Sequence, residues 1–150
     1  MYTCTFSRSA ARNTFYLKKV GVTHVLNTAE GQTSGTVDTN QKFYKPFNIK
    51  YKGLKLLDVS QANISIHFTE IAEFIDEALQ GGGKVLVNCQ KGVSRSSAAV
   101  LAYLMLRHNM TAVEALVEVR KHRDVRPNDG FLRQLAELDN KLRKDRGLLK

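Results

Sequence analysis

The sequence predicts an α/β protein in which a central, mostly parallel sheet is flanked by helices. In residues 84–87 one lysine is followed by the apolar run Val-Leu-Val, which is typical of a strand that is buried on both faces of a parallel sheet. Hydrophobic residues recur at helical spacing before this run, and residues 96–107 after it are apolar nearly all round. Strands that alternate with helices are typical of such a sheet, and 150 residues are enough for one domain.

Two more strands are expected before residue 84. Residues 24–27 follow a glycine turn and are mainly apolar, and residues 48–57 contain β-type side chains up to the residue before Asp58. The stretch 28–42 is rich in Gly, Thr, Ser and Asn and is predicted to be a loop. The first ten residues lack an apolar pattern, so residues 1–14 are expected to be a flexible segment. Residues 143–150 are expected to form a basic tail.

Helices are indicated by apolar periodicity and by their caps. From Ile64 the apolar residues lie on one face, Asn63 or Ser65 can cap this helix, and three glycines end it. Thr111 and Glu114 have the spacing of a capping box. The predicted helices span residues 64–79, 96–107, 111–120 and 128–142.

The composition narrows the class of protein. With 23 Lys and Arg against 14 Asp and Glu the net charge is +9, which favours anionic partners such as phosphoproteins, nucleic acid or lipid headgroups. No apolar run approaches the roughly 20 residues that span a bilayer, and the N-terminus lacks the apolar core of a signal peptide. Cys4 and Cys89 are too few for a disulfide framework or a four-ligand zinc site, so a reducing compartment, cytoplasm or nucleus, is expected.

The segment Cys89–Ser96, with the sequence Cys-Gln-Lys-Gly-Val-Ser-Arg-Ser, joins the buried strand to the central helix. Backbone N–H groups in such a turn can converge on one anion, and the helix N-terminus adds about half a positive charge. Gly92 permits the tight curl, and the planar guanidinium of Arg95 can hold two phosphate oxygens. The same field should lower the pKa of Cys89, and a thiolate in an anion-binding cradle is suited to attack phosphorus. The alternative for a single Cys is a small buried hydrophobe.

Two more residues are candidates for the chemistry. Asp58 follows a predicted strand and should reach the same sheet edge as Cys89, where a carboxyl group can protonate the leaving oxygen. The alternative for Asp58 is a turn residue. Ser96 can hydrogen-bond the thiolate, and it can equally be the N-cap of the following helix.

Together these motifs resemble those of the dual-specificity protein phosphatases, cysteine-dependent enzymes that remove phosphate from Tyr and from Ser/Thr. The resemblance covers residues 15–142 and is greatest to the small atypical members, which consist of a single catalytic domain. It implies a fold like that of the protein tyrosine phosphatases. The segments that carry it are Val22–Asn27, Asp58, Cys89–Ser96, Ala102–Met105 and Arg126–Phe131.

The resemblance implies a role for each matching residue. Cys89 would be the nucleophile, Arg95 the phosphate clamp and Asp58 the general acid and then the general base. Ser96 would assist breakdown of the phosphocysteine, and Asn128 would brace the surrounding loops. The implied substrate-binding residues are Gln90, Lys91, Gly92, Val93, Ser94 and Arg95, with Arg123 for a second phosphate.

The resemblance also implies the ligands. Phosphorylated proteins are the expected substrates, with mitogen-activated protein kinases as a family-level expectation. Phosphate-like anions such as vanadate or sulfate are expected to occupy the cradle. No metal or other cofactor is implied, and nucleic acid is not favoured as a partner.

The sequence departs from the family at two places. Asn88 replaces the His that usually precedes the nucleophile, and an Asn can donate a hydrogen bond but never carries positive charge. We therefore expect a smaller lowering of the pKa of Cys89 and slower turnover. The usual N-terminal strand motif is absent from residues 1–13, so we expect either that the sequence starts late or that one edge of the sheet is left open.

Two other functions stay open on the sequence. The charge of +9 is compatible with a phosphoinositide or RNA 5′-phosphate phosphatase, although Lys91 is the single lysine in the cradle segment. Asn88 is compatible with a pseudophosphatase that binds phosphoproteins without turnover. Against that interpretation, Cys89, Arg95 and Asp58 are all present.

Overall fold

The core of the protein is a parallel sheet of four strands within residues 3–148, the part of the chain that this computed structural model describes. The order of the strands is β1-β4-β2-β3, so the two inner strands are far apart in the sequence. The predicted α/β architecture with a parallel sheet is confirmed. The strands are β1 (Thr3–Phe6), β2 (His24–Asn27), β3 (Lys50–Gly53) and β4 (Val85–Asn88).

All four strands end at the same edge of the sheet. Asn88, the last residue of β4, is level with Phe6 of β1 and with Asn27 of β2, and Asn27 is level with Gly53 of β3. The segments that follow the strands therefore start side by side. In an open parallel sheet this is the edge at which ligands bind.

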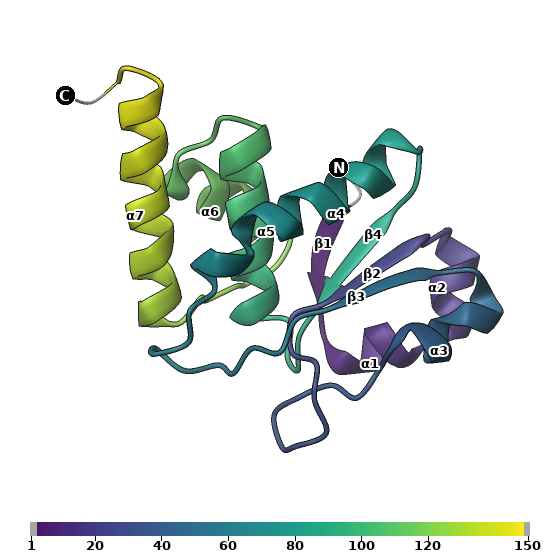
Figure 1. The fold of residues 1–150 in the computed structure, drawn as a ribbon. Coiled ribbons are helices and arrows are strands. Elements are labelled where there is room, and N and C mark those ends of the chain that lie inside the picture. The colour runs from purple at the N-terminus through teal and green to yellow at the C-terminus, as the bar shows by residue number, and fades with distance from the viewer. Residues whose placement is uncertain (1–2, 149–150) are drawn as a thin grey trace.

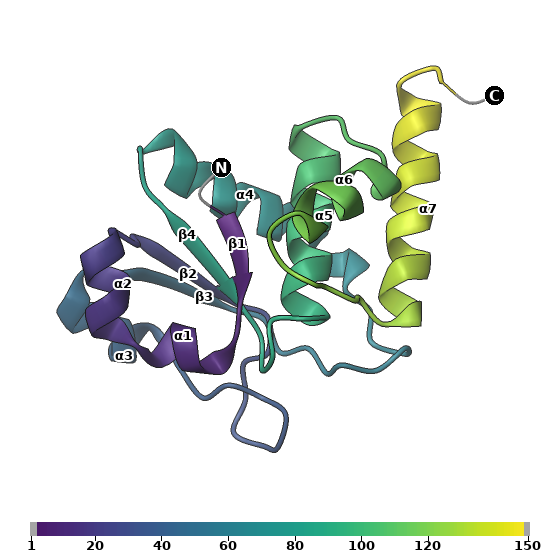
Figure 2. The same ribbon diagram turned by 180° about the vertical axis from the view of Figure 1, so that it is seen from behind.

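Helices cover both faces of the sheet (Figures 1 and 2). On one face α1, α2 and α3 pack on Val25 and Leu86, while α4 and α5 cover the other face over Leu26, Val85 and Val87. The helices α6 and α7 pack on the outer side of α5. Their bounds are α1 (Arg8–Arg12), α2 (Thr14–Val20), α3 (Gln41–Tyr44), α4 (Phe68–Gln80), α5 (Arg95–Arg107), α6 (Ala112–Arg120) and α7 (Asp129–Asp145), with 3-10 turns at Lys45–Phe47 and Ser65–His67.

The central position predicted for residues 96–107 is confirmed by α5. Every residue of α5 from Arg95 to Met105 is buried, because this helix is enclosed by the sheet, α4, α6 and α7. The predicted capping box is present, since Thr111 accepts from the N–H of Glu114 and the Glu114 carboxylate accepts from the N–H of Thr111. No helix in residues 3–148 is long and apolar enough to cross a membrane.

The expectation of an open sheet edge at the N-terminus is wrong. Thr3–Phe6 forms β1 along the whole length of β4. The short helix α1 follows within residues 1–14, the segment that was expected to be flexible, and α2 begins at Thr14. The signals for α2 are local: Asn13 accepts a hydrogen bond from the N–H of Tyr16 at its start, and Gly21 at its end has φ +83°. Four residues are too short a run for periodicity to identify β1.

Other predicted boundaries also differ from the structure. The helix expected from Ile64, with Asn63 or Ser65 as its cap, begins at Phe68 after a 3-10 turn, and His67 is at the cap position. The strand predicted over 48–57 is limited to Lys50–Gly53, because its neighbour β2 ends level with Gly53 and offers no further ladder. The predicted loop 28–42 ends in the first turn of α3, which Asn40 caps. Residues 143–145, expected in the tail, are the last residues of α7.

The loop that carries Asp58 lies directly against the start of α7. A Cβ atom placed on Gly130 would come within 2.0 Å of the carbonyl oxygen of Ser60, so this contact requires glycine. The path of the Asp58 loop is thus set by a helix that begins some 70 residues further along the chain.

We expect Gly130→Ala to destabilise the protein by about 1–3 kcal/mol, because the added methyl group must displace the Ser60 backbone. Denaturant unfolding measures the effect. Gly81→Ala is the matched control, since its Cβ would meet nothing closer than 3.5 Å and φ there is −80°. Equal stabilities of the two variants would contradict this account of the contact.

Candidate active site

The segment between β4 and α5 forms a tight backbone cradle around the sulfur of Cys89. The N–H of Cys89 donates to Phe6 O at 3.2 Å, and the N–H of Gly92 donates to Cys89 Sγ at 3.2 Å. The curl depends on Gly92, which has φ +75° and whose Cβ would meet the Phe6 backbone at 2.7 Å. Cys89 itself is 3% exposed and lies at the floor of the cradle.

Other parts of the chain hold the carbonyl groups of the cradle from outside. Arg8 N–H donates to Gln90 O at 3.0 Å, and Arg126 N–H donates to Val93 O at 2.9 Å. In a peptide unit the N–H lies opposite the C=O, so carbonyls bound from outside turn the following N–H groups toward Cys89. This is the anion nest predicted from the sequence, and the nearby side chain of Gln90 has a buried Oε1 without a hydrogen-bond partner.

The hydrogen bonds of the cradle favour the thiolate form of Cys89. Burial by itself would raise the pKa of Cys89, but the hydroxyl of Ser96, 3.2 Å from Sγ, and the backbone N–H groups of Ser96, Gly92 and Val93 together lower it below its ordinary value. The structure thus brings Ser96 to the sulfur, as predicted. Since Ser94 precedes α5 and Ser96 lies inside it, the alternative of Ser96 as a helix cap does not apply.

Arg95 is buried at the start of α5, with its guanidinium held by two backbone carbonyls. Nη1 donates to Leu56 O at 3.0 Å, and Nη2 donates to Gly35 O at 2.6 Å. Its Nε is buried and has no hydrogen-bond partner. A buried cation with an unused donor is suited to bind an anion in the cradle, because an unpaired charge in the interior is costly.

Asn128 connects the loop of Asp58 to the cradle. Its side-chain Nδ2 donates to Asp58 Oδ1 at 3.0 Å, and its backbone N–H donates to Ser94 Oγ at 2.9 Å. Its Oδ1 accepts from the N–H of Phe131 and so caps α7. Asp58 is exposed on this loop rather than at the end of a strand, and the structure brings it to the same edge of the sheet as Cys89.

Arg123 also reaches the cradle, but its guanidinium binds the protein itself. Nε donates to Gly92 O at 3.2 Å, and Nη2 donates to Lys91 O at 2.9 Å. Arg123 therefore supports the curl of the cradle, and Nη2 lies where a Cβ on Gly92 would meet it at 2.9 Å. The side chain of Lys91 is exposed beside it.

Asn88 is the last residue of β4, directly before Cys89, and its side chain contacts the end of β2. Its Nδ2 donates to Asn27 Oδ1 at 3.3 Å rather than to the backbone of Cys89, and its Oδ1 is buried without a partner. Its carbonyl oxygen accepts from both the N–H and the hydroxyl of Thr28, each at 2.8 Å. Asn88 thus joins the ends of β4 and β2 below the cradle.

A buried polar network under residues 31–36 was not found by sequence reasoning. Asn27 Nδ2 donates to Val37 O at 2.9 Å and to the hydroxyl of Tyr51 at 3.2 Å, and Tyr51 in turn donates to the carboxylate of Glu30. Burial first, and then the bond to Glu30, raise the pKa of Tyr51, so it stays a neutral donor. The network fixes the loop whose Gly35 carbonyl accepts from Arg95. The sequence could not predict this contact, because every residue has the same backbone carbonyl.

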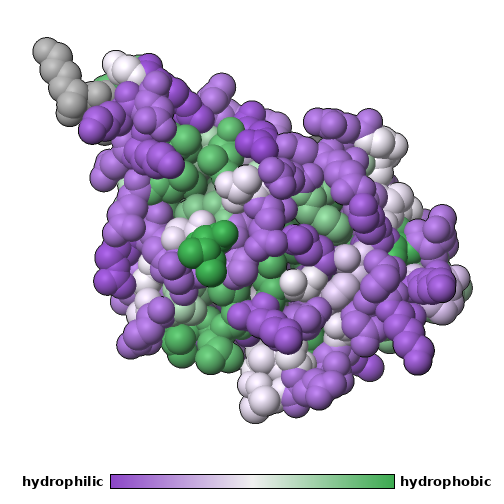
Figure 3. Space-filling model, in the orientation of Figure 1, coloured by the Kyte–Doolittle hydropathy of each residue, from purple (hydrophilic) through white to green (hydrophobic). Residues whose placement is uncertain are grey.

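The described surface also has a cavity that contains none of the predicted site residues. It has a volume of about 320 Å³ and lies between α4, α5 and α7, on the face shown in Figure 3, where apolar side chains gather between α7 and α4. Its lining includes Phe68, Leu106, Leu138 and Leu142 together with Glu137, Lys141 and Asp145. The cradle around Cys89 is the place where chemistry-bearing residues converge.

These features are typical of a cysteine-dependent phosphatase: a Cys-x5-Arg cradle after an inner strand of a parallel sheet, a Cys whose pKa is lowered, and an Asp on a loop at the same edge of the sheet. Residues 3–141 match the family model described as "Dual specificity phosphatase, catalytic domain". The chain belongs to this family.

Curated relatives and solved structures agree with this assignment. The chain is 46% identical over 141 residues to dual specificity protein phosphatase 13B of Mus musculus, covering 93% of this chain and 70% of that protein. It is 48% identical over 134 residues to dual specificity protein phosphatase 26 of Homo sapiens, covering 89% of this chain and 62% of that protein, so it spans less than two thirds of this relative.

The structure is similar to crystal structures of the same fold. The human tyrosine phosphatase-like serine/threonine/tyrosine-interacting protein matches with a TM-score of 0.83 and 32% identity, over 93% of this chain and 92% of that one. The structure titled DUSP15 matches with a TM-score of 0.79 and 26% identity, over 96% and 89% of the two chains. The fold class predicted from the sequence is therefore confirmed.

We expect Ser96→Ala to move the acid limb of the pH–rate profile upward, because the thiolate loses its side-chain hydrogen bond and the pKa of Cys89 rises. Below the midpoint, kcat/KM should fall by roughly tenfold. The pH dependence of Cys89 alkylation by iodoacetamide gives an independent measure. Ser9→Ala, an exposed serine on α1, is the control, and an unchanged alkylation midpoint in Ser96→Ala would contradict the assignment.

Asn88→His should lower the pKa of Cys89 and increase turnover, because an imidazole at this buried position can carry the positive charge that an amide lacks. The measurement is the pH profile of kcat on an aryl phosphate, with thermal unfolding to confirm that the larger ring is accommodated. A folded variant with the same profile as the parent protein would show that Asn88 is neutral.

Proposed function

We propose that this protein hydrolyses phosphotyrosine and phosphoserine/phosphothreonine in proteins through a phosphocysteine intermediate. The observation that carries the proposal is the position of Cys89 Sγ among inward-directed backbone N–H groups, with the buried Arg95 beside it. Such a cradle stabilises the charge on the equatorial phosphate oxygens as the phosphoryl group is transferred.

In the first step the thiolate of Cys89 attacks phosphorus. A P–S bond forms as the P–O bond to the substrate side chain breaks, and Asp58 gives its proton to the leaving oxygen. The Nε of Arg95 and the N–H groups of the cradle bind the transferred group, while the carbonyls of Leu56 and Gly35 keep the guanidinium in place.

In the second step a water molecule attacks the phosphocysteine. Asp58, now a carboxylate, takes a proton from the water as the new P–O bond forms and the P–S bond breaks. The hydroxyl of Ser96 donates to the departing sulfur and so stabilises the restored thiolate. Inorganic phosphate leaves the cradle and the enzyme returns to its first state.

The range of substrates is part of the proposal. The family assignment and the short Asp58 loop, held by Asn128, support action on both phosphotyrosine and phosphothreonine. Mitogen-activated protein kinases are proposed as partners, and vanadate or sulfate as anions that occupy the cradle. Because the mechanism needs a free thiol, we propose that the protein works in the cytoplasm or nucleus.

Two observations favour a second candidate, a protein that binds phosphoproteins without turnover. One of the similar solved structures is named as that of a tyrosine phosphatase-like, interacting protein, and the Oδ1 of Asn88 lies without a hydrogen-bond partner next to Cys89. The presence of Cys89, Asp58 and Arg95, each held in place by a hydrogen bond to a neighbouring loop or to the cradle, favours catalysis.

A panel of substrates tests the proposed reaction: tyrosine and threonine phosphopeptides, doubly phosphorylated kinase activation-loop peptides, phosphoinositides and 5′-triphosphorylated RNA. We expect phosphate release from the peptides and inhibition by vanadate. Cys89→Ser should abolish release, and Asp58→Asn should lower kcat by about 10²–10³-fold, because general acid catalysis typically contributes about 10²–10⁴-fold.

The same panel separates the alternatives. Phosphate release that depends on Cys89 but occurs only with phosphoinositides or RNA would overturn the proposal that proteins are the substrates. Binding of phosphopeptides with no release that depends on Cys89 would favour the binding protein.

A further inference from the structure

The positive charge of the protein is concentrated in its first third. Residues 1–57 contain nine Lys and Arg against two acidic residues, a net charge of +7, whereas residues 58–150 contain fourteen against twelve, a net charge of +2. In the structure much of this positive charge lies on one face of the sheet, because residues 1–57 supply the helices α1, α2 and α3 that cover that face.

These helices carry cations and no acidic residue. We call their outer surface the cationic face. All six of its charged side chains are exposed, and within the described part of the chain none of them forms a salt bridge. They are Arg8, Arg12, Lys18, Lys19, Lys42 and Lys45.

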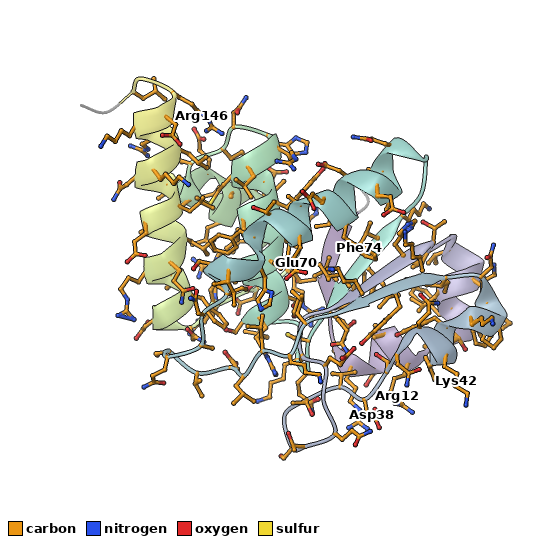
Figure 4. The ribbon with its side chains drawn as sticks, viewed as in Figure 1. Arg12, Asp38, Lys42, Glu70, Phe74 and Arg146 are labelled. Atoms are coloured by element: carbon orange, nitrogen blue, oxygen red, sulfur yellow. The ribbon has the colours of Figure 1, made fainter. Side chains whose placement is uncertain are left out.

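In the other layer, some cations pair with acidic side chains of the same helix or of a neighbouring helix. Arg107 of α5 pairs with Asp76, and Arg143 of α7 pairs with Asp139 at 3.3 Å. Asp38, in the loop before α3, is labelled beside Arg12 in Figure 4, and Arg12 donates to its backbone oxygen rather than to its carboxylate. The face is thus left with unneutralised charge.

The cationic face is continuous with the active site. The N–H of Arg8, the first residue of α1, donates to Gln90 O in the cradle, so α1 starts at the phosphate-binding loop. Arg12 follows on α1 and lies over the ring of Phe43, and Figure 4 shows it near Lys42 of α3. A chain that places its phosphoresidue at Cys89 can therefore continue across this surface.

Exposed aromatic rings lie among the cations. Phe15 is 78% exposed and shares a helical face of α2 with Lys18 and Lys19, at spacings of three and four residues. Tyr16 next to it is also exposed. Aromatic residues beside unpaired cations are typical of surfaces that bind a partner, with the ring as the apolar contact.

We propose that the cationic face docks an acidic segment of the phosphoprotein substrate, next to the phosphoresidue held at Cys89. The proposal rests on the proposed phosphatase function and adds to it a preference for phosphosites that are followed or preceded by acidic residues. A lipid surface is less favoured, because one strongly exposed ring offers little apolar area for insertion.

The test compares phosphotyrosine peptides that are identical except for a flanking tract of Glu, placed on either side, or of Gln. We expect about a five- to tenfold higher kcat/KM for the better Glu peptide at low salt, decreasing in 0.5 M salt as the charges are screened. Lys42→Glu/Lys45→Glu and Lys18→Glu/Lys19→Glu should each reduce this preference, with hydrolysis of a small aryl phosphate unchanged.

Lys141→Glu/Lys144→Glu is the matched control. It makes the same change in net charge on α7, in the other layer, and should keep the preference. Equal rates on Glu and Gln peptides, or equal losses in the control and in the variants of the cationic face, would overturn the docking site.

A binding measurement with Cys89→Ser separates this result from the proposed function. If the parent protein releases no phosphate, fluorescence anisotropy of the same peptides still reports whether Glu tracts bind better and whether the lysine variants remove the difference. Vesicles with 30% phosphatidylserine form the last arm. Binding to them through the same lysines, without any preference for Glu peptides, would assign the face to a lipid surface and overturn the proposal.

Discussion

The site depends on one constraint: the peptide units after Cys89 must turn their N–H groups toward its sulfur. A buried sulfur would otherwise remain a thiol, because burial raises its pKa. The constraint is met because the carbonyls on the other side of these units are bound by Arg8, Arg123 and Arg126. Elements from both ends of the chain thus hold the cradle in a conformation that its own eight residues do not enforce.

The buried Arg95 is positioned in the same way. Arg95 contacts the carbonyls of Leu56 and Gly35, one on the segment of Asp58 and the other on the loop over Tyr51. Both segments begin where a parallel strand ends, so the level ends of the strands bring them to one guanidinium. Cys89, Arg95 and Asp58, the proposed nucleophile, clamp and acid, therefore share a framework, and a change in either loop affects more than one of them.

Sequence reasoning was most accurate where the determinant is local. The burial of β4, the apolar surface of α5 and the capping box at Thr111 depend on neighbouring residues and are all present in the structure. It failed for β1, whose four residues form a strand because β4 has an open edge beside them. It also overestimated β3, whose length is set by the end of β2 rather than by the β-type residues that follow Gly53.

The sequence by itself determined which residues make up the proposed site, because Cys89, Gly92, Arg95 and Ser96 lie within one strand-to-helix turn and their spacing implies an anion cradle with a thiolate. Only the tertiary structure decided how that turn is held: which carbonyls bind Arg95, that Asn128 links Asp58 to Ser94, and that Arg123 binds the cradle itself. It also decided that the excess positive charge lies on one layer. These contacts join residues distant in the chain, often through backbone atoms that are the same in every residue.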